Sequence, residues 1–162
     1  MAPGEGLLGA LEAAPIAVAM RTQLWLYPSI EILHILGFAV LVGSIVVLDL
    51  RLLGISRSLP VCTLSRHVLP WSLGAFIVIV PTGFLMFMAH ATDFINNPAF
   101  LLKLALIVLA GVNAAVFHAG AFRRSLQWDR DVSPPAAAKA HAAASIAIWV
   151  GVISCGRLLA YL

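Results

Sequence analysis

The sequence has 162 residues, of which 62% are hydrophobic and only 10% are charged, with a mean hydropathy of +1.01 and a formal net charge of +3. Soluble domains are typically about 45–50% apolar and about 25% charged, so a fold of this length could not hide so much apolar surface from water. The composition excludes a soluble globular domain and a disordered chain, and it predicts an all-α protein embedded in a membrane. Ten basic residues spread around apolar segments indicate membrane topology, and we expect no nucleic-acid partner.

The first 27 residues predict a segment at the membrane interface rather than a signal peptide or a spanning helix. No basic residue precedes Arg21, whereas a signal peptide opens with a basic region. The stretch 6–27 is too interrupted to span, so it favours one or two short helices with Trp25 and Tyr27 at headgroup level. We therefore divide the chain into an interfacial amphipathic segment, residues 1–27, and a transmembrane domain, residues 28–162.

Four segments are long and apolar enough to cross a bilayer, for which about 20 residues are needed. They cover about residues 29–53, 67–91, 98–122 and 135–162. Each is expected to be a helix, because an open strand edge cannot satisfy its backbone groups in hydrocarbon. The sequence therefore predicts a transmembrane four-helix bundle with an N-terminal interfacial helix.

The basic residues predict the orientation of this bundle. Seven of the ten lie in or beside two connections, the one after the first span and the one after the third: Arg51, Arg57, Arg66, Arg123, Arg124, Arg130 and Lys139. Because cytoplasmic loops carry an excess of lysine and arginine, both connections are expected in the cytoplasm. The chain would then be a multi-pass protein of a bacterial inner membrane with both termini on the outer, periplasmic side.

The histidines are the leading candidates for function, since a polar residue at mid-membrane costs about 2.5–3.5 kcal/mol on insertion scales and usually has a partner or a role. Depth along the spans sorts them into an outer pair, His34 and His90, and an inner pair, His118 and His141, with His67 near the inner surface. In a helix bundle, facing histidines can hold the iron of haem b through one imidazole on each face. The leading hypothesis is therefore a haem b-binding electron-transfer protein, not an enzyme on its own.

Other residues bear on this hypothesis. Cations near the two surfaces would hold the haem propionates, Arg157 on the outer side and Arg123 on the inner side. Arg157 also lies near Tyr161, and its alternative role is a salt bridge to Glu31. A quinone or a redox protein would be the electron partner, and the chain would form a homo-oligomer or a subunit of a larger oxidoreductase. Small residues beside the histidines suit a porphyrin, but they also serve plain helix packing.

A second group of residues supports copper handling on the outer side instead. Met86 and His90 are four residues apart and share a helix face, with Met88 between them. Thioether and imidazole ligands suit copper(I), and His34 lies on the same side of the membrane. A third hypothesis is a cofactor-free accessory or anchor subunit of a larger membrane complex, whose intramembrane polar residues bond only to protein.

Asp49 is an acidic residue within the first span, near the inner end of that span. Asp49 and Arg51 are two residues apart, so their side chains do not face each other on a helix. We expect Asp49 to bond instead to Arg66, to Arg123 or to another helix.

Several segments together resemble a known group of proteins. They are Trp25–Gly37, Gly43–Gly54, Pro81–Leu85, Asn97–Lys103, Asn113–His118 and Trp149–Tyr161, with Asp49-Leu-Arg51 and Gly156-Arg157 as the most specific parts. They resemble a family of small bacterial inner-membrane proteins with no assigned function, and the resemblance covers nearly the whole chain. That family is similar in layout to the membrane part of copper-resistance D proteins and, more loosely, to b-type four-helix cytochromes. The resemblance implies a four-helix bundle with His34 and His118 as matched histidines, and it implies no reaction.

Overall fold

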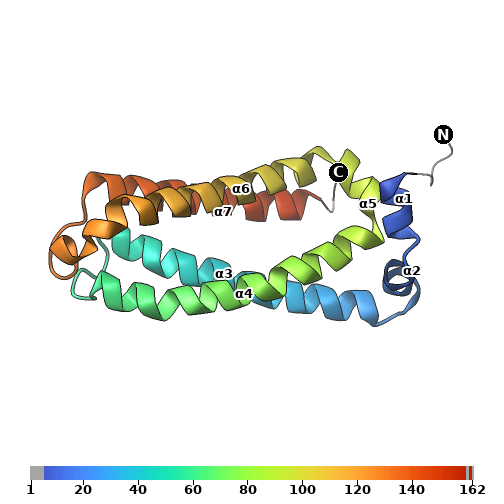
Figure 1. Ribbon diagram of the computed structural model, residues 1–162, viewed down its shortest axis with the longest axis horizontal. Helices are drawn as coiled ribbons and strands as arrows, with labels where there is room; N and C mark the ends of the chain where they lie inside the picture. Colours follow the sequence, from blue (N-terminus) through green and yellow to red (C-terminus); the bar gives the residue numbers. More distant parts are fainter. Residues whose placement is uncertain (1–5, 160, 162) are drawn as a thin grey trace.

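Four long helices run alongside one another in the computed structural model, which describes residues 6–159 and Tyr161 (Figure 1). They are α3 (Leu26–Leu53), α4 (Val61–Ala89), α6 (Pro98–Ala119) and α7 (Ala136–Leu158). Each contains an 18-residue window with a mean hydropathy between 1.5 and 2.4, and each is long enough to cross a membrane. The chain is a multi-pass membrane protein, and the predicted four-helix bundle is confirmed.

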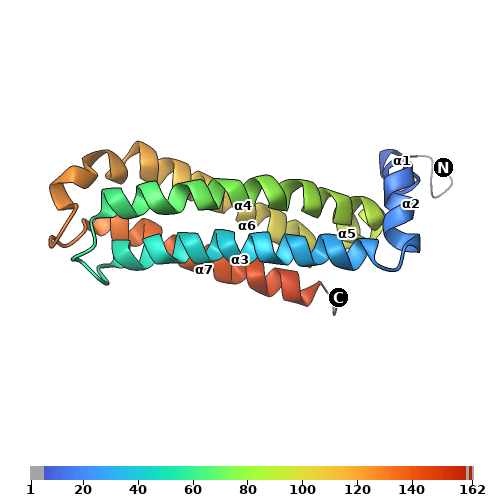
Figure 2. The same cartoon turned by 90° about the horizontal axis from the view of Figure 1, so that it is seen from below.

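Short helices close one end of the bundle, which we call the terminal end. Helices α1 (Leu7–Glu12) and α2 (Pro15–Thr22) lie across this end rather than along the bundle (Figure 2). Helix α5 (Ala91–Asn96) joins α4 to α6 beside them. The opposite end, the loop end, holds the connection from α3 to α4 and the 3₁₀ helix η1 (Ala121–Trp128), which leads from α6 towards α7.

Local sequence explains where two of the long helices meet their loops. Gly54 follows α3 with a φ of 103°, a left-handed conformation that glycine adopts without the steric cost of a Cβ atom. Its N–H donates to the Arg51 carbonyl, and the Ile55 N–H donates to the Leu50 carbonyl. At the start of α6, the Asn97 side chain accepts a hydrogen bond from the Ala99 N–H at 2.9 Å.

The start of α4 depends on a distant residue instead. The helix begins at Val61, six residues before the predicted boundary at 67. The Asp129 carboxylate accepts a hydrogen bond from the Cys62 N–H at 2.7 Å, and the Asp129 carbonyl accepts one from the Val61 N–H at 2.9 Å. Asp129 follows η1, so it satisfies the free N–H groups of the first turn of α4 from the other side of the loop end.

The long helices pack as two pairs, α3 with α4 and α6 with α7, and α7 also packs against α3. The backbones of α4 and α6 stay further apart in the part of the chain that the structure describes, and these helices meet through side chains such as the stacked rings of Phe87 and Phe100, whose centroids are 5.7 Å apart. Trp149 and Val152 of α7 are buried against Leu41, Ala75 and Ala110 in the middle of the bundle. Large apolar side chains on the outer faces remain exposed, which is the arrangement expected of helices in contact with membrane lipid.

Candidate functional site

A cavity of about 370 Å³ lies between the four long helices, in the half of the bundle nearer the loop end. Its walls are mostly apolar, and all four helices contribute to them. The polar side chains that line it are Asp49, Ser72, Asn113, His118, His141 and Ser145. Cavities that bind small molecules typically measure about 300–1,000 Å³ and combine apolar walls with a few polar groups, so this one is the candidate site.

His118 presents an unpartnered nitrogen in this cavity wall. Its Nδ1 atom lies 2.8 Å from the carbonyl oxygen of Ala114, one turn earlier on α6. A carbonyl can only accept a hydrogen bond, so Nδ1 carries the proton and Nε2 carries the lone pair. The Nε2 atom is buried and has no hydrogen-bond partner among the described residues. A neutral imidazole held through Nδ1–H is the form in which histidine binds metal ions.

His141 is held in the same way by a residue of the neighbouring helix. The Asn113 amide nitrogen donates to the His141 carbonyl at 3.1 Å, and the Asn113 amide oxygen lies 2.8 Å from His141 Nδ1. Because the amide oxygen can only accept, Nδ1 of His141 is the donor. Asn113 therefore joins α6 to α7 and leaves Nε2 of His141 available.

Aromatic rings surround the two imidazoles. The Phe117 ring centroid lies 5.2 Å from that of His118 and 6.0 Å from that of His141. Phe122 lies 5.0 Å from His118 on the side of the loop end. The structure thus brings His118 and His141 together in one apolar, aromatic-lined cavity.

Asp49 contributes the carboxylate that lines the cavity. Its residue surface is 6% exposed, and its Oδ2 atom has no hydrogen-bond partner among the described residues. The Ser145 hydroxyl of α7 is close enough to interact with the carboxyl, and no ion pair to a basic residue is formed in the described part of the chain. The contact is thus with another helix rather than with Arg66 or Arg123. A buried polar atom without a partner is rare enough to suggest that something else meets it there.

His34 lies outside this cavity, in the half nearer the terminal end. Its Nδ1 atom is 2.9 Å from the Thr82 hydroxyl oxygen, and that hydroxyl donates to the Val78 carbonyl at 2.7 Å. The Thr82 oxygen therefore accepts from His34 Nδ1–H, which leaves Nε2 of His34 as an acceptor. The ring lies directly on Gly83, where a Cβ atom would come within 3.0 Å of the imidazole Cε1.

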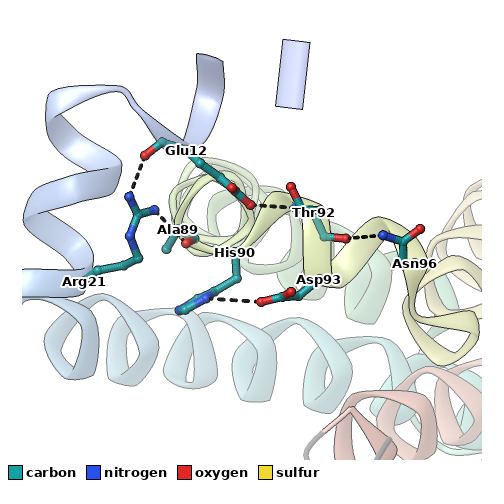
Figure 3. Close-up of polar contacts among 7 residues, drawn as sticks. All are labelled: Glu12, Arg21, Ala89, His90, Thr92, Asp93 and Asn96. Atoms are coloured by element: carbon teal, nitrogen blue, oxygen red, sulfur yellow. Dashed lines mark hydrogen bonds and ion pairs between the residues drawn. The ribbon is translucent and has the colours of Figure 1, made fainter. Parts of the chain in front are cut away.

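His90 lies at the terminal end, where α4 stops, and is drawn in Figure 3. Its Nδ1 atom is 3.7 Å from the Asp93 carboxylate, and its ring meets the edge of Tyr27 at 6.2 Å. Eight residues separate His90 from Thr82, the partner of His34, which corresponds to about 12 Å along a helix. The structure therefore does not bring His34 and His90 into one site.

The methionines of the copper hypothesis lie near His90 on α4. Met88 is buried, and Met86 is partly buried. Among the residues that the structure describes, no three histidine, cysteine, aspartate or glutamate side chains are close enough to share a metal ion.

The two arginines expected to hold propionates are both exposed. Arg157 donates a hydrogen bond to the Tyr161 hydroxyl and lies 4.8 Å from the centre of that ring. It forms no ion pair with Glu31 in the described residues, so the expected salt bridge is not formed. Tyr161 lies four residues further along the chain, so its hydroxyl and ring are within reach of the guanidinium. Arg123 lies exposed in η1 at the loop end.

A sequence family matches residues 19–162, which include all five histidines and every residue of the cavity wall. It is described as a family of unknown function, DUF6644. The chain belongs to DUF6644. No curated protein and no solved structure matches the chain. The resemblance to a functionally unassigned membrane family is thereby supported, whereas no similarity to copper-resistance D proteins or to b-type cytochromes is shown.

Sequence reasoning missed two of the residues that orient histidines in this DUF6644 chain. Thr82 and Gly83 position His34 from α4, and neither is charged or a usual ligand. Asn113 was recognisable as a polar residue within a span, but its bond to His141 connects positions 28 residues apart. Nothing in the sequence shows which distant residue will be the partner of a polar side chain, so these contacts appear only in the folded bundle.

Replacing Gly83 by alanine should destabilise the DUF6644 chain relative to the matched Gly74→Ala variant. Both glycines lie within α4, where alanine is favoured over glycine by about 0.5–1 kcal/mol. A Cβ atom at Gly74 would meet open space, whereas one at Gly83 would press on His34, and such overpacking costs about 1–3 kcal/mol. Thermal unfolding in detergent measures the difference. Equal unfolding temperatures for the two variants would contradict the close packing of His34 on Gly83.

A polar network fastens the short N-terminal helices of the DUF6644 chain to the terminal end (Figure 3). Arg21 donates to the carbonyls of Glu12 and Ala89, at 2.7 Å and 2.9 Å. The Glu12 carboxylate accepts a hydrogen bond from the Thr92 N–H at 2.7 Å. These bonds join α1 and α2 to α4 and α5, and none of their residues lines the cavity.

This network should weaken in acid. The hydrogen bond from the Thr92 N–H holds the pKa of the Glu12 carboxyl below its usual value. A lowered pKa means that the contribution to stability is complete above the pKa of the unfolded chain, near 4.5, and is lost as the pH falls through the folded value. Hydrogen exchange of the Thr92 amide, expressed as a protection factor, should therefore fall between pH 6 and pH 3. Glu12→Gln keeps an acceptor oxygen and should remove the pH dependence; the same dependence in that variant would contradict the assignment.

Proposed function

We propose that this DUF6644 chain binds haem b in the cavity between its four long helices and serves as an electron-transfer protein of the membrane. One observation carries the proposal: His118 and His141 line the same cavity, each is held through Nδ1–H, and each leaves Nε2 available. Haem iron is bound in membrane helix bundles through such imidazole nitrogens. Bound haem supplies a centre that takes up and releases one electron at a time.

The residues present fit such a group. The cavity wall includes small residues on α6 and α7 that leave room for a flat ring: Ala110, Gly111, Ala114 and Ala142. The buried Nε2 atom of His118 has no hydrogen-bond partner among the described residues, so its lone pair would be free to bind the iron. Asn113 and the Ala114 carbonyl orient the two imidazoles, as the hydrogen-bond partners of metal-binding histidines usually do. Arg123, at the loop end, would hold a propionate.

The orientation proposed for the chain follows from its basic residues. Arg57, Arg66, Arg123, Arg124 and Arg130 lie exposed at the loop end. In a bacterial inner membrane the excess of basic residues marks the cytoplasmic side, so the loop end and the cavity would lie towards the cytoplasm. Both termini would then lie on the periplasmic side.

We propose haem in preference to copper because the fold brings the two haem ligands into one cavity but does not bring the copper ligands together. His118 and His141 share a cavity, whereas the copper hypothesis needs His34 together with His90. Thr82, the α4 residue that His34 contacts, lies about two helical turns before His90. On this proposal the chain catalyses no reaction by itself and passes electrons to or from a quinone or a redox protein.

An absorption spectrum of the detergent-purified chain, expressed with a supply of haem, tests the proposal. The reduced protein should show the Soret and alpha bands of haem b, and a haemochrome assay should give about one haem per chain. A folded but colourless chain would overturn the proposal. Elemental analysis of the same sample distinguishes the alternatives: copper without haem supports copper handling, and absence of both supports a cofactor-free subunit.

A further inference from the structure

The 3₁₀ helix η1 at the loop end has an inner and an outer face (Figure 1). In a 3₁₀ helix, side chains three residues apart share a face. Ser125 and Trp128 follow this spacing and are each only 5% exposed, so they mark the inner face. The residues between and before them, Arg123, Arg124 and Leu126, are exposed. The outer face of η1 therefore presents two adjacent arginines together with a leucine.

The inner face holds η1 in place on the bundle. Trp128 packs in an apolar cluster that includes residues of all four long helices. The Ser125 hydroxyl oxygen lies 3.3 Å from the Cys62 sulfur at the start of α4. The Phe122 ring lies 5.0 Å from that of His118, near the end of α6. Because η1 is held along its length, its outer face has a defined position rather than that of a free loop.

The arginines of the outer face have no acidic partner within the described chain. Neither Arg123 nor Arg124 forms an ion pair with any residue of that part. The two carboxylates nearest to them in sequence are already engaged: Asp129 caps α4, and Asp131 lies 3.4 Å from Nε of Arg130. Guanidinium groups bind phosphate oxygens through paired, charge-assisted hydrogen bonds. Two adjacent guanidinium groups without a counter-charge therefore favour a phosphate-containing, anionic ligand.

Leu126 indicates that this ligand also has an apolar part. Leu126 is 82% exposed, and Ile55 and Leu59 in the other connection of the loop end are 55% and 49% exposed. An apolar side chain gains free energy when it leaves water for an apolar environment. A phospholipid joins a phosphate to acyl chains and can meet both the arginines and the leucine, whereas inorganic phosphate meets only the arginines.

The length of α6 places η1 at the depth of the lipid headgroups. Helix α6 has 22 residues, which at about 1.5 Å per residue span about 33 Å, close to the thickness of about 30 Å of a hydrocarbon core. Only Gly120 separates the end of α6 from the start of η1. The chain therefore leaves the hydrocarbon core with α6 and enters the headgroup layer with η1. This depth favours a lipid over a soluble acidic protein.

We propose that the outer face of η1, formed by Arg123, Arg124 and Leu126, binds an anionic phospholipid. The guanidinium groups donate to the phosphate oxygens of the lipid, and Leu126 lies against its acyl chains. The lipid site goes beyond the proposed function and does not depend on haem. Because Arg123 also enters the haem proposal as the partner of a propionate, the lipid site is tested at Arg124 and Leu126, which the haem proposal does not use.

Native mass spectrometry of the full-length, detergent-purified chain, titrated with phosphatidylglycerol or with phosphatidylcholine of the same acyl chains, tests the proposal. The wild-type chain should bind phosphatidylglycerol more tightly, because the choline group carries its own cation beside the phosphate. Arg124→Gln should raise Kd for phosphatidylglycerol about five-fold, the effect of one basic residue beside an anionic lipid surface. Leu126→Ser should raise it as well. The matched control is Lys139→Gln, which removes the same charge from a lysine that bonds to Ser133 at the loop end, and it should leave Kd unchanged.

Three results would overturn the proposal. The first is equal affinity of the wild-type chain for the two lipids, and the second is an equal loss in Arg124→Gln and Lys139→Gln, since binding would then follow only the total charge of the loop end. The third is displacement of the lipid by an equal concentration of glycerophosphoglycerol, the same headgroup without acyl chains, which would indicate a water-soluble phosphate as the ligand.

The same samples separate the lipid site from the haem site. Arg124→Gln and Leu126→Ser replace exposed side chains, so both variants should unfold at the temperature of the wild-type chain, and their loss of lipid is then not a loss of fold. A colourless chain that binds phosphatidylglycerol through Arg124 overturns only the haem proposal. A haem-containing chain that does not distinguish the two lipids overturns only the lipid site.

Discussion

The His118→Ala variant should lose the Soret and alpha bands that we expect of the wild-type chain. The Nε2 atom of His118 is buried in the cavity wall and has no partner among residues 6–159 and Tyr161, so alanine removes the nitrogen that would bind the iron. His141→Ala should have a comparable effect, because its Nε2 is the second available nitrogen in the cavity. Haem content per chain, measured on purified protein after the same expression and purification, checks both variants.

Controls separate a ligand from a residue that merely stabilises the bundle. His67→Ala removes an exposed histidine of α4 outside the cavity and should leave haem content unchanged. Asn113→Leu keeps both imidazoles but removes the hydrogen-bond acceptor of His141, and loss of such a partner typically weakens metal binding about 10–100-fold. Unchanged bands in both His118→Ala and His141→Ala would contradict the assignment of the cavity.

The Arg51→Met variant should lose about 3–5 kcal/mol of stability, a large effect for one substitution. The Arg51 side chain is 2% exposed and donates to three carbonyl oxygens at the loop end: Leu59 at 2.7 Å, Arg57 at 3.1 Å and Asp129 at 3.0 Å. Methionine fills similar space but offers no donor, so these carbonyls lose a charged partner. Unfolding of the detergent-solubilised chain by denaturant measures the loss.

Arg57 provides the matched control for Arg51. It belongs to the same loop end, is exposed, and its side chain donates to the Gly54 carbonyl at 3.2 Å. Arg57→Met should change stability by less than about 0.5 kcal/mol, as exposed substitutions usually do. Equal losses in the two variants would show that Arg51 does not hold the loop end together in the manner described. Within the Asp49-Leu-Arg51 segment the two charged residues thus have different surroundings: Asp49 lines the cavity, and Arg51 donates hydrogen bonds to carbonyls of the loop end.

Features that depend on neighbours in sequence could be predicted without the fold. The four spans follow from runs of apolar residues, because length and hydrophobicity alone decide whether a helix can cross a membrane. Asn97 caps α6 through an N–H two residues away. The short helices before the first span follow from residues 6–27, where the apolar runs are too interrupted for a spanning helix.

Boundaries fixed by distant partners could not be predicted in this way. Helix α4 starts six residues before the expected position because Asp129, 67 residues from Cys62, caps it. Arg157 was expected to pair with Glu31, yet it lies against Tyr161. For Arg157 the sequence identified a residue that needed a partner but not which partner the fold would bring close, and for α4 it gave no sign of the distant cap.

The sequence by itself determined that the chain is a four-helix membrane protein, and it predicted how deep each polar residue lies. Depth is a coordinate along one helix, and about 1.5 Å per residue is enough to estimate it. Only the tertiary structure decided which residues face each other: it brings His118 and His141 into one cavity with Asp49, and it separates His34 from His90. The physical reason is that spans in lipid are apolar on nearly every face, so the hydrophobic pattern does not show which face of each helix points into the bundle.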